Sequence, residues 1–253
     1  MLQVEGVSRS FGKLVALHDV SLRVDAGSIA GVIGPNGAGK STLFNLITGL
    51  GRPESGTIRF SGKRIDGRPT YWIACLGIAR TFQNLRLFPH ATALENILTG
   101  EHVRLRSNLL EDLVRTPGQR REEEQARARA FELLHLVGLR RAANVRAAAL
   151  SYGDQRRLEI ARALASRPRL LLLDEPAAGM NPVEKDGLAE LVRTIHRTGM
   201  TVLLIEHDMR FVMGLCEHLT VLDYGERIAD GVPQAVRENP RVIEAYLGSE
   251  LPA

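Results

Sequence analysis

The spacing of apolar residues in the first third of the chain predicts a series of short strands. Apolar-rich segments are separated by Gly12, Gly27 and Gly34, which mark the turns between them. We predict strands over residues 2–7, 15–24 and 29–33, and a further strand over residues 57–60, directly after a Pro-Glu-Ser-Gly turn.

The later part of the chain alternates apolar runs with a helical pattern. An apolar run at residues 170–173 precedes a helix predicted over residues 182–197, and a second, mostly apolar run follows at residues 201–205. Runs of this length are typical of strands that are buried on both faces, and their alternation with helices is typical of parallel sheets. We therefore predict an α/β core.

The middle of the chain, between residues 84 and 160, has a helical spacing instead. Residues 126–137 place Phe131, Leu134 and Val137, or alternatively Leu133 and Leu136, on one stripe with Arg and Glu opposite. The densely charged residues 119–129 predict an exposed helix start that is supported by Glu/Arg pairs. We predict a helical subdomain over residues 84–159, inserted into an α/β core formed by residues 1–83 and 160–253.

Charge and hydropathy narrow the choice of partners. The net charge is +4 and the isoelectric point is near 9.4, but Arg and Glu alternate, which indicates a solvated mixed surface and no nucleic-acid partner. No apolar run approaches the roughly 20 residues that span a bilayer, and the first residues lack the pattern of a secretory signal. We expect a cytosolic (cytoplasmic) protein that reaches a membrane only through partners. Cys75 and Cys216 are predicted to be reduced thiols in or near the core.

One glycine-rich segment carries the strongest chemical signal. Residues 34–41 fit the P-loop pattern G-x-x-x-x-G-K-[ST] at every fixed position, between an apolar strand and a helix predicted over residues 42–50. Glycines let several backbone N–H groups converge on phosphate oxygens, and the helix adds its positive N-terminal end. We predict that Lys40 neutralises the β- and γ-phosphates of ATP and that the Ser41 hydroxyl is a ligand of Mg²⁺. The predicted ATP-binding residues here are Gly34, Pro35, Asn36, Gly37, Ala38, Gly39, Lys40, Ser41 and Thr42.

Two carboxylates follow the apolar run at residues 170–173. Asp174 and Glu175 end a predicted parallel strand, at the edge where ligands of α/β sheets bind. We predict that Asp174 holds Mg²⁺, directly or through water, and that Glu175 orients the attacking water as general base. An acidic pair alone also fits a solvated strand end, and the preceding P-loop favours the catalytic interpretation.

A third segment, residues 150–157, resembles the signature of ABC ATPases. It begins Leu-Ser-Tyr-Gly-Asp-Gln and runs into a helix predicted over residues 158–165, whereas the usual signature reads Leu-Ser-Gly-Gly-Gln; Tyr152 and Asp154 depart from that consensus. In this family the signature Ser and Gly bind the γ-phosphate held on the opposite subunit, so the resemblance implies that Ser151 and Gly153 contact ATP in trans. Taken alone, Ser151 would be an ordinary helix N-cap.

The resemblance extends over nearly the whole chain and implies further roles. It places Phe11 on the adenine, where the family more often has Tyr, with Ala16 beside it. It matches Gln83 to a glutamine that contacts Mg²⁺ and the attacking water, and His207 to the switch histidine at the γ-phosphate. Asn181 stands where the family usually has an Asp that makes a cross-dimer contact. The implied fold is a P-loop NTPase (RecA-like) core with an N-terminal antiparallel β-subdomain and an inserted α-helical subdomain that carries the signature.

One copy of each ATP-contacting motif implies a second ATPase subunit. In this family the P-loop and the signature of one chain face different nucleotides, so we expect a homodimer or a heterodimer around two ATP molecules. Residues 79–88, 150–162 and 175–182, the charged insertion near residues 105–124 and the ending at residues 239–248 most resemble the larger, LivG-like subunits of branched-chain amino-acid importers. That resemblance implies transmembrane permease subunits, indirect contact with an external solute-binding protein, and a peripheral location on the inner face of the plasma membrane.

Three other classes stay open at this point. ATPases of importers for urea or another small polar solute, or of lipopolysaccharide export, share the same motor. Soluble ABC proteins of translation or DNA repair usually carry two cassettes or a very long insertion, and this chain has neither. A regulatory ATP-binding module without turnover is disfavoured by the presence of Lys40, Asp174, Glu175 and His207.

Overall fold

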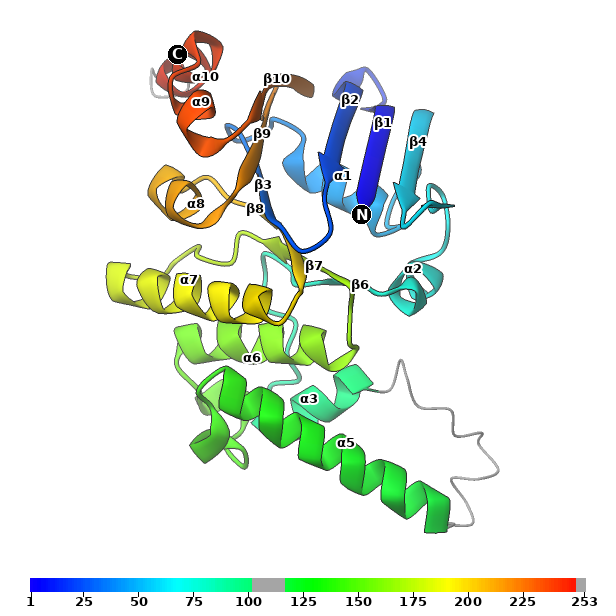
Figure 1. Ribbon diagram of the computed structural model, residues 1–253, viewed down its shortest axis with the longest axis vertical. Coiled ribbons are helices and arrows are strands. Elements are labelled where there is room, and N and C mark those ends of the chain that lie inside the picture. Colours follow the sequence, from blue (N-terminus) through cyan, green and yellow to red (C-terminus); the bar gives the residue numbers. More distant parts are fainter. Residues whose placement is uncertain (102–116, 249–253) are drawn as a thin grey trace.

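The computed structural model describes residues 1–101 and 117–248 as two sheets flanked by helices (Figure 1). The strands are β1 (Leu2–Phe11), β2 (Leu14–Val24), β3 (Ile29–Ile33), β4 (Ser55–Phe60), β5 (Lys63–Arg64), β6 (Ile78–Arg80), β7 (Leu170–Asp174), β8 (Thr201–Ile205), β9 (His218–Asp223) and β10 (Glu226–Gly231). The helices are α1 (Lys40–Ile47), α2 (Thr70–Leu76), α3 (Ala93–Glu101), α5 (Pro117–Leu136), α6 (Tyr152–Ala165), α7 (Pro182–Arg197), α8 (Met209–Leu215), α9 (Pro233–Arg237) and α10 (Pro240–Gly248), with short 3₁₀ turns η2 (Arg140–Ala142) and η3 (Ala147–Ala149). Residues 105–116 of the predicted charged insertion lie outside the described residues.

The larger sheet is mostly parallel, as the sequence predicts. Its strand order is β10-β9-β3-β8-β7-β6, and only its edge strand β10 pairs with its neighbour in the antiparallel direction among the strands described. Every residue of β3, β7 and β8 is buried, which is typical of strands covered on both faces. Because β8 alone separates β3 from β7, the segments that follow these two strands emerge close together at one edge of the sheet.

The smaller sheet is antiparallel, with the order β2-β1-β4-β5. β1 continues to Phe11, beyond the predicted end at residue 7, because pairing with β2 supplies hydrogen bonds to a stretch whose polar residues show no alternation. Phe11 pairs with Leu14 across a turn in which Gly12 has a φ of 63°. The second strand of this hairpin, β2, contacts β10, the edge strand of the larger sheet.

Two hydrophobic cores lie on opposite faces of the larger sheet. In β7, Leu171 and Leu173 belong to the core formed with α3, α5, α6 and α7, whereas Leu170 and Leu172 belong to the core formed with α1 and the antiparallel sheet. Successive side chains of a strand point to opposite faces, so this short apolar run serves both cores. The predicted α/β core with an N-terminal antiparallel β-subdomain is confirmed by this arrangement of sheets and helices.

The helices α3, α5 and α6 pack together at the end of the molecule away from the antiparallel sheet (Figure 1). On α5 and just beyond it, Leu134 and Val137 are fully buried, while Phe131, Leu133 and Leu136 are partly buried against the same core. The first of the two predicted stripes therefore supplies the deepest contacts. Residues 121–125 of the charged helix start are exposed, as expected.

Three local predictions were wrong. The helix that contains the signature begins at Tyr152 rather than at residue 158, because the Ser151 side chain caps it. The helix after the P-loop spans Lys40–Ile47 rather than residues 42–50. Cys75 is exposed on the short helix α2, whereas Cys216 is buried, and burial raises the pKa of the Cys216 thiol to about 12.

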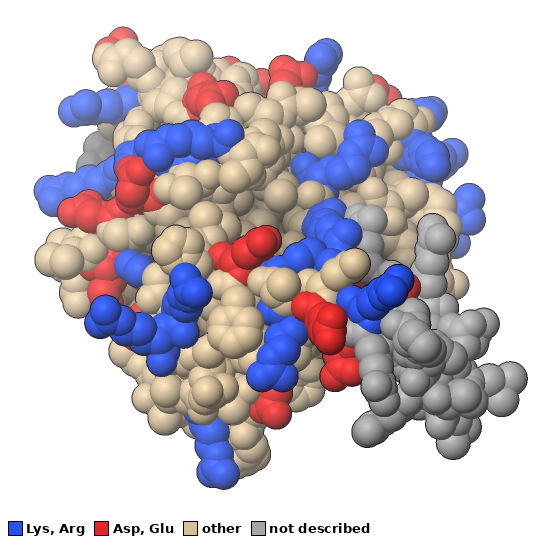
Figure 2. All heavy atoms as spheres, turned by 60° about the horizontal axis from the view of Figure 1, so that its bottom comes forward, with Lys and Arg blue, Asp and Glu red and all other residues tan. Residues whose placement is uncertain are grey.

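Surface charge follows the mixed pattern of the sequence. On the face drawn in Figure 2, basic and acidic side chains are interspersed rather than gathered into a block of one sign. Within residues 1–101 and 117–248, no helix combines the length and the apolar character that crossing a membrane requires.

Candidate functional site

The P-loop lies between β3 and α1 and needs glycine at two close backbone contacts. Gly34 has a φ of 149°, and a Cβ there would lie 2.0 Å from the carbonyl oxygen of Leu222. Gly39 has a φ of 98°, and its Cβ would lie 2.4 Å from the carbonyl oxygen of Ala16. Any other residue would push β9 or β2 away, so these glycines allow the loop to sit against both strands.

Lys40, the first residue of α1, carries a buried ammonium group. Its Nζ donates to the carbonyl oxygens of Gly34 at 2.7 Å and Pro35 at 2.8 Å. Burial lowers the pKa of Lys40, and the negative charges of Glu175 and Asp174 act in the opposite direction. A desolvated cation beside a helix N-terminus is a favourable position for an anion such as a phosphate group.

A cleft of about 390 Å³ opens in front of this loop. Its walls contain many of the residues predicted to bind ATP, together with two that the sequence did not reveal, Leu14 and Val15: the lining is Phe11, Leu14, Val15, Ala16, Asn36, Gly37, Ala38, Gly39, Lys40, Ser41, Thr42, Gln83 and Glu175. Phe11, Leu14 and Val15 are more than half exposed, and this apolar hairpin tip beside the P-loop fits a planar base. The signal available in the sequence was the pair of apolar residues just after the Gly12 turn.

The predicted base Glu175 lies directly after β7 and is met by two predicted partners. Gln83 Nε2 donates to Glu175 Oε2 at 3.1 Å, and His207 Nδ1 lies 3.8 Å from the same oxygen. Glu175 has a φ of 46°, in the left-handed region that residues other than glycine seldom occupy. The structure thus brings Gln83, Glu175 and His207 together, although they are far apart in the sequence.

Glu206, which the sequence did not single out, supports the turn that follows Glu175. Its side chain is fully buried and accepts a hydrogen bond from the backbone N–H of Ala177 at 2.8 Å. Burial raises the pKa of Glu206, and the bond from Ala177 counteracts the increase. This carboxyl therefore helps to fix the backbone between Glu175 and α7.

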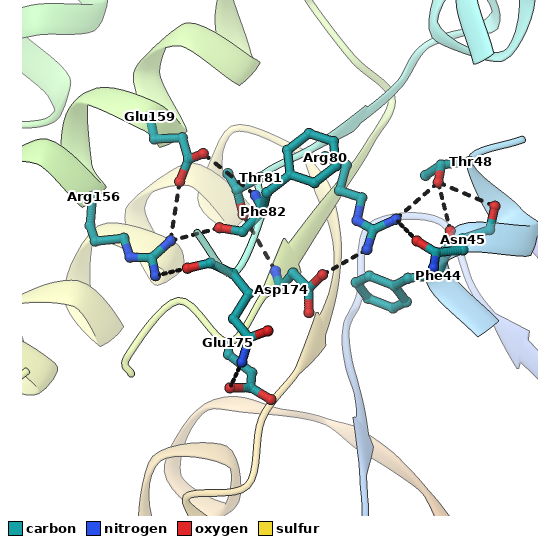
Figure 3. A network of polar contacts seen from close by, with 11 residues as sticks. Phe44, Asn45, Thr48, Arg80, Thr81, Phe82, Arg156, Glu159, Asp174 and Glu175 are labelled. Atoms are coloured by element: carbon teal, nitrogen blue, oxygen red, sulfur yellow. Dashed lines mark hydrogen bonds and ion pairs between the residues drawn. The ribbon is translucent and has the colours of Figure 1, made fainter. Parts of the chain in front are cut away.

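Asp174, the predicted Mg²⁺ ligand, is held by an arginine that the sequence did not single out (Figure 3). Arg80 Nη2 lies 2.7 Å from Asp174 Oδ2, and both side chains are buried. The same guanidinium donates to Asn45 Oδ1 at 2.8 Å and to Thr48 Oγ1 at 3.1 Å, both on α1 or at its end. Arg80 thereby links the carboxylate at the end of β7 to the helix that follows the P-loop.

The donor set around Asp174 fits a magnesium ion. Among the residues described, no group of three or more His, Cys, Asp or Glu side chains could hold a metal by itself. The predicted ligands Ser41, Gln83 and Asp174 all offer oxygen atoms, which Mg²⁺ prefers, and this ion commonly takes its other ligands from phosphates and water. Arg80 engages Oδ2 of Asp174, so Oδ1 is the oxygen left for a cation.

The residues predicted to bind ATP in trans lie outside the cleft, at the N-terminal ends of α6 and α7. Ser151 Oγ accepts from the backbone N–H of Asp154 at 3.2 Å, and Gly153 lies so close to Glu184 that a Cβ would be 3.1 Å from its carboxylate. Asn181 and Glu184 form a capping box, with bonds of 3.0 Å and 2.9 Å. These positions are compatible with contact to a second subunit.

Comparison with known proteins gives a consistent result. Residues 17–178 match the family described as ABC transporter, and residues 226–251 match the family described as branched-chain amino acid ATP-binding cassette transporter. The chain is 48% identical to the high-affinity branched-chain amino acid transport ATP-binding protein BraF of Pseudomonas aeruginosa, over 98% of each chain. It is 46% identical to the corresponding protein LivG of Escherichia coli, also over 98% of each chain. Among solved structures, the ADP conformation of MJ1267, an ATP-binding cassette of an ABC transporter, superposes with a TM-score of 0.86 at 34% identity over 98% of both chains.

Proposed function

Because the chain belongs to the ABC transporter family and is closely related to the ATP-binding proteins of branched-chain amino-acid transport, we propose that it powers the import of branched-chain amino acids. As an ABC ATPase it binds nucleotide and hydrolyses ATP, and as a transporter subunit it works with membrane permeases. In our proposal it does so by closing on two ATP molecules with a second ATPase subunit, identical or paralogous. An external binding protein delivers the amino acid, which never touches this chain.

The nucleotide is held by the cleft between the hairpin tip and the P-loop. Phe11, Leu14 and Val15 offer an apolar surface for the base, and the N–H groups of residues 36–41 surround the phosphates. Lys40 exchanges its two carbonyl partners for phosphate oxygens, which is favourable because its ammonium is already desolvated. The observation that carries the ATPase part of the proposal is this convergence of Lys40, Gln83 and Glu175 on one cleft, whereas the solute is inferred from the similarity to BraF and LivG.

Turnover depends on the residues at the end of β7. Glu175 accepts a proton from the attacking water, Gln83 orients that carboxylate, and His207 reaches the γ-phosphate from the neighbouring strand end. Ser41, Gln83 and Asp174 would hold Mg²⁺, which when bound neutralises charge on the phosphate oxygens. Ser151, Gly153 and Asn181 of the second subunit complete the enclosure and exclude water.

A groove between the core and the helices supports a permease docking site. It has a volume of about 370 Å³ and is lined by residues of α2, β6, α3 and α6, together with Phe82 and Phe88 from the segment between β6 and α3. Phe82 directly precedes Gln83, so an inserted permease segment would touch the chain next to the catalytic glutamine. This contact gives a route by which ATP hydrolysis and permease movement can be coupled.

The catalytic assignment is tested with Glu175→Gln. We expect ATP binding to be retained and hydrolysis to fall by at least about a hundredfold, because Gln cannot accept the proton. Light scattering should then reveal an ATP-dependent dimer, with this chain alone or together with its paralogue. The matched control is Glu190→Gln on the exposed side of α7, which should hydrolyse ATP at the rate of the unchanged protein. Wild-type turnover in Glu175→Gln would refute the role of Glu175.

The transported solute is tested separately. Permeases that co-purify with the chain from membranes are reconstituted with it in ATP-loaded liposomes, and the external binding protein is added outside. ATP-driven uptake of labelled leucine is then compared with uptake of labelled urea. We expect leucine uptake that depends on ATP and on Glu175. Urea uptake without leucine uptake, or co-purification with a lipopolysaccharide-export permease, would overturn the assignment of the solute while leaving the ATPase assignment intact.

A further inference from the structure

A buried ion pair on α6 holds the backbone of the segment that carries Gln83 (Figure 3). Arg156 and Glu159 are both almost completely buried, and Arg156 Nη1 lies 3.3 Å from Glu159 Oε2. Arg156 donates to the carbonyl oxygen of Phe82 at 2.7 Å and also to the carbonyl oxygen of Gln83. In addition to its side-chain partner, the arginine therefore binds two consecutive backbone carbonyl groups of a loop.

Glu159 holds the same loop through its other oxygen. Glu159 Oε1 accepts from the backbone N–H of Phe82 at 3.5 Å and of Arg86 at 3.3 Å. Burial raises the pKa of Glu159, while these N–H groups and Arg156 lower it. Since a buried charge without partners is costly, the pair is tied to this loop conformation and resists its displacement.

Tyr152 connects this pair to the signature turn. Its hydroxyl accepts from Arg156 Nε at 3.2 Å and from Arg156 Nη2 at 2.9 Å. Its ring lies against Gly179, where a Cβ would be 3.4 Å from the ring edge. The ABC signature usually has glycine at this position, which could make neither contact, so the tyrosine adds a link between the turn at Ser151 and the arginine.

The contacts form a continuous path across the molecule. It runs from the Tyr152 hydroxyl through Arg156 to the Gln83 carbonyl, and from the Gln83 side chain to Glu175 Oε2 at 3.1 Å. In the proposed function, one end is the turn that meets the second subunit's nucleotide, and the other is the base that acts on this chain's own nucleotide. Each non-covalent step of this path is a hydrogen bond between described residues.

We propose that Tyr152, Arg156 and Glu159 form a signature clamp, a set of positioning residues that fixes the backbone of Gln83 and makes the orientation of Glu175 depend on the signature turn. The inference rests on the proposed function, because it needs ATP to be hydrolysed at Glu175. When the signature turn of this chain engages the partner's nucleotide, the clamp aligns Gln83 and Glu175 of this chain at its own nucleotide. Each site then becomes competent only when the other is occupied and closed.

The clamp is tested first by hydrogen exchange on the purified full chain, without ATP turnover. Tyr152→Phe removes one hydroxyl from a half-exposed ring and leaves the fold intact. We expect the amides of Phe82 and Arg86 to exchange about tenfold faster in this variant, since the arginine loses its anchor. Glu159→Gln keeps an acceptor oxygen, so the amides of Phe82 and Arg86 should exchange in it at a rate between those of the unchanged protein and of Tyr152→Phe. Tyr71→Phe, an equally small change on the exposed side of α2, is the control. Unchanged exchange at Phe82 and Arg86 in Tyr152→Phe would overturn the clamp.

A double-mutant cycle with Gln83 then separates coupling from simple structural support. We expect Tyr152→Phe to lower kcat about fivefold with KM changed less than twofold, since ATP binding needs only the P-loop cleft. In a Gln83→Ala background, Tyr152→Phe should have no further effect, because the clamp acts through Gln83. Multiplicative effects of the two changes would refute the proposal. Absence of ATP hydrolysis in the unchanged chain, alone and with its paralogue, would instead refute the proposed function.

Discussion

Two buried arginines, Arg80 and Arg156, lie on opposite sides of Phe82, and they differ in what they hold (Figure 3). Arg80 points to side chains: the carboxylate of Asp174 and the polar groups of Asn45 and Thr48. Arg156 points to backbone: the carbonyl oxygens of Phe82 and Gln83. The first arginine holds the carboxylate that we predict to be a Mg²⁺ ligand, and the second holds the backbone of a loop.

The surroundings of the two arginines follow the same division. The Arg80 guanidinium lies between two aromatic rings, 5.6 Å from the centroid of Phe44 and 5.0 Å from that of Phe82, which restricts its movement. Arg156 instead depends on Glu159 and on the hydroxyl of Tyr152, so its position changes if α6 moves. The site therefore has one fixed side, built on the parallel sheet, and one adjustable side, built on the helices. The predictions below probe that difference, from the largest expected effect to the smallest.

Removing Arg80 should have the largest effect. Arg80→Met leaves the buried Asp174 carboxylate without its cation, and we expect the free energy of unfolding to fall by about 3–5 kcal/mol. Urea denaturation measures this loss, and Arg197→Met on the exposed side of α7 is the control. Arg80→Lys, which keeps the charge, should recover part of the stability.

Arg80→Lys also tests the comparison of the two arginines when ATP binding is measured. If Arg80 fixes Asp174 for a cation, Arg80→Lys should weaken ATP binding about tenfold when Mg²⁺ is present. ATP binding without Mg²⁺ should change little. Calorimetric titration with and without Mg²⁺ measures both values. An equal loss in both conditions would mean that Arg80 supports the fold and not the position of Asp174.

Removing Arg156 should cost less stability than removing Arg80, and the size of this loss should depend on pH. Arg156→Met leaves Glu159 with two backbone donors, so we expect a loss of about 2–3 kcal/mol at about pH 8. Burial already raises the pKa of Glu159, and removal of the arginine raises it further. A carboxyl whose folded-state pKa is raised stabilises the fold below its unfolded-state pKa, and this contribution is lost as pH rises through the folded-state pKa. The deficit of Arg156→Met relative to the unchanged protein should therefore shrink at about pH 5, and a constant deficit would contradict this account.

Sequence reasoning correctly placed the P-loop, Asp174 and Glu175 at the ends of core strands because the signals for those positions are local. The P-loop, Asp174 and Glu175 each follow an apolar strand, and the strand order places those strand ends together. The same locality identified β7, β8 and α7 with boundaries within a residue of those observed. The helical side was located as a region, but its charged residues looked like ordinary helix-surface residues.

Long-range contacts explain what the sequence did not reveal. Three side chains acquire their importance from partners far away in the chain, and nothing in the spacing of their neighbours marks them as buried: Arg80, Arg156 and Glu159. Cys75 was misplaced for the opposite reason, since its apolar neighbours belong to a short helix that turns only one side inward. Ser151 was read both as a helix cap and as a trans ligand; the cap is present in the structure, and the trans role stays a prediction.

The smallest effect on stability should come from Ser151 itself, and it separates those two roles. Its hydroxyl accepts one exposed bond of 3.2 Å from Asp154 N–H, so Ser151→Ala should cost about 1 kcal/mol of unfolding free energy. Thr92 provides a matched control, because its hydroxyl accepts a 3.2 Å bond from Glu95 N–H at the start of α3. Ser151→Ala and Thr92→Ala should both bind ATP normally as isolated chains. Only Ser151→Ala should lose ATP turnover, by about tenfold, because the Ser151 hydroxyl contributes to the partner's site. Equal turnover in the two variants would leave Ser151 a helix cap and nothing more, and the adjustable side of the site would then need another contact to sense the second nucleotide.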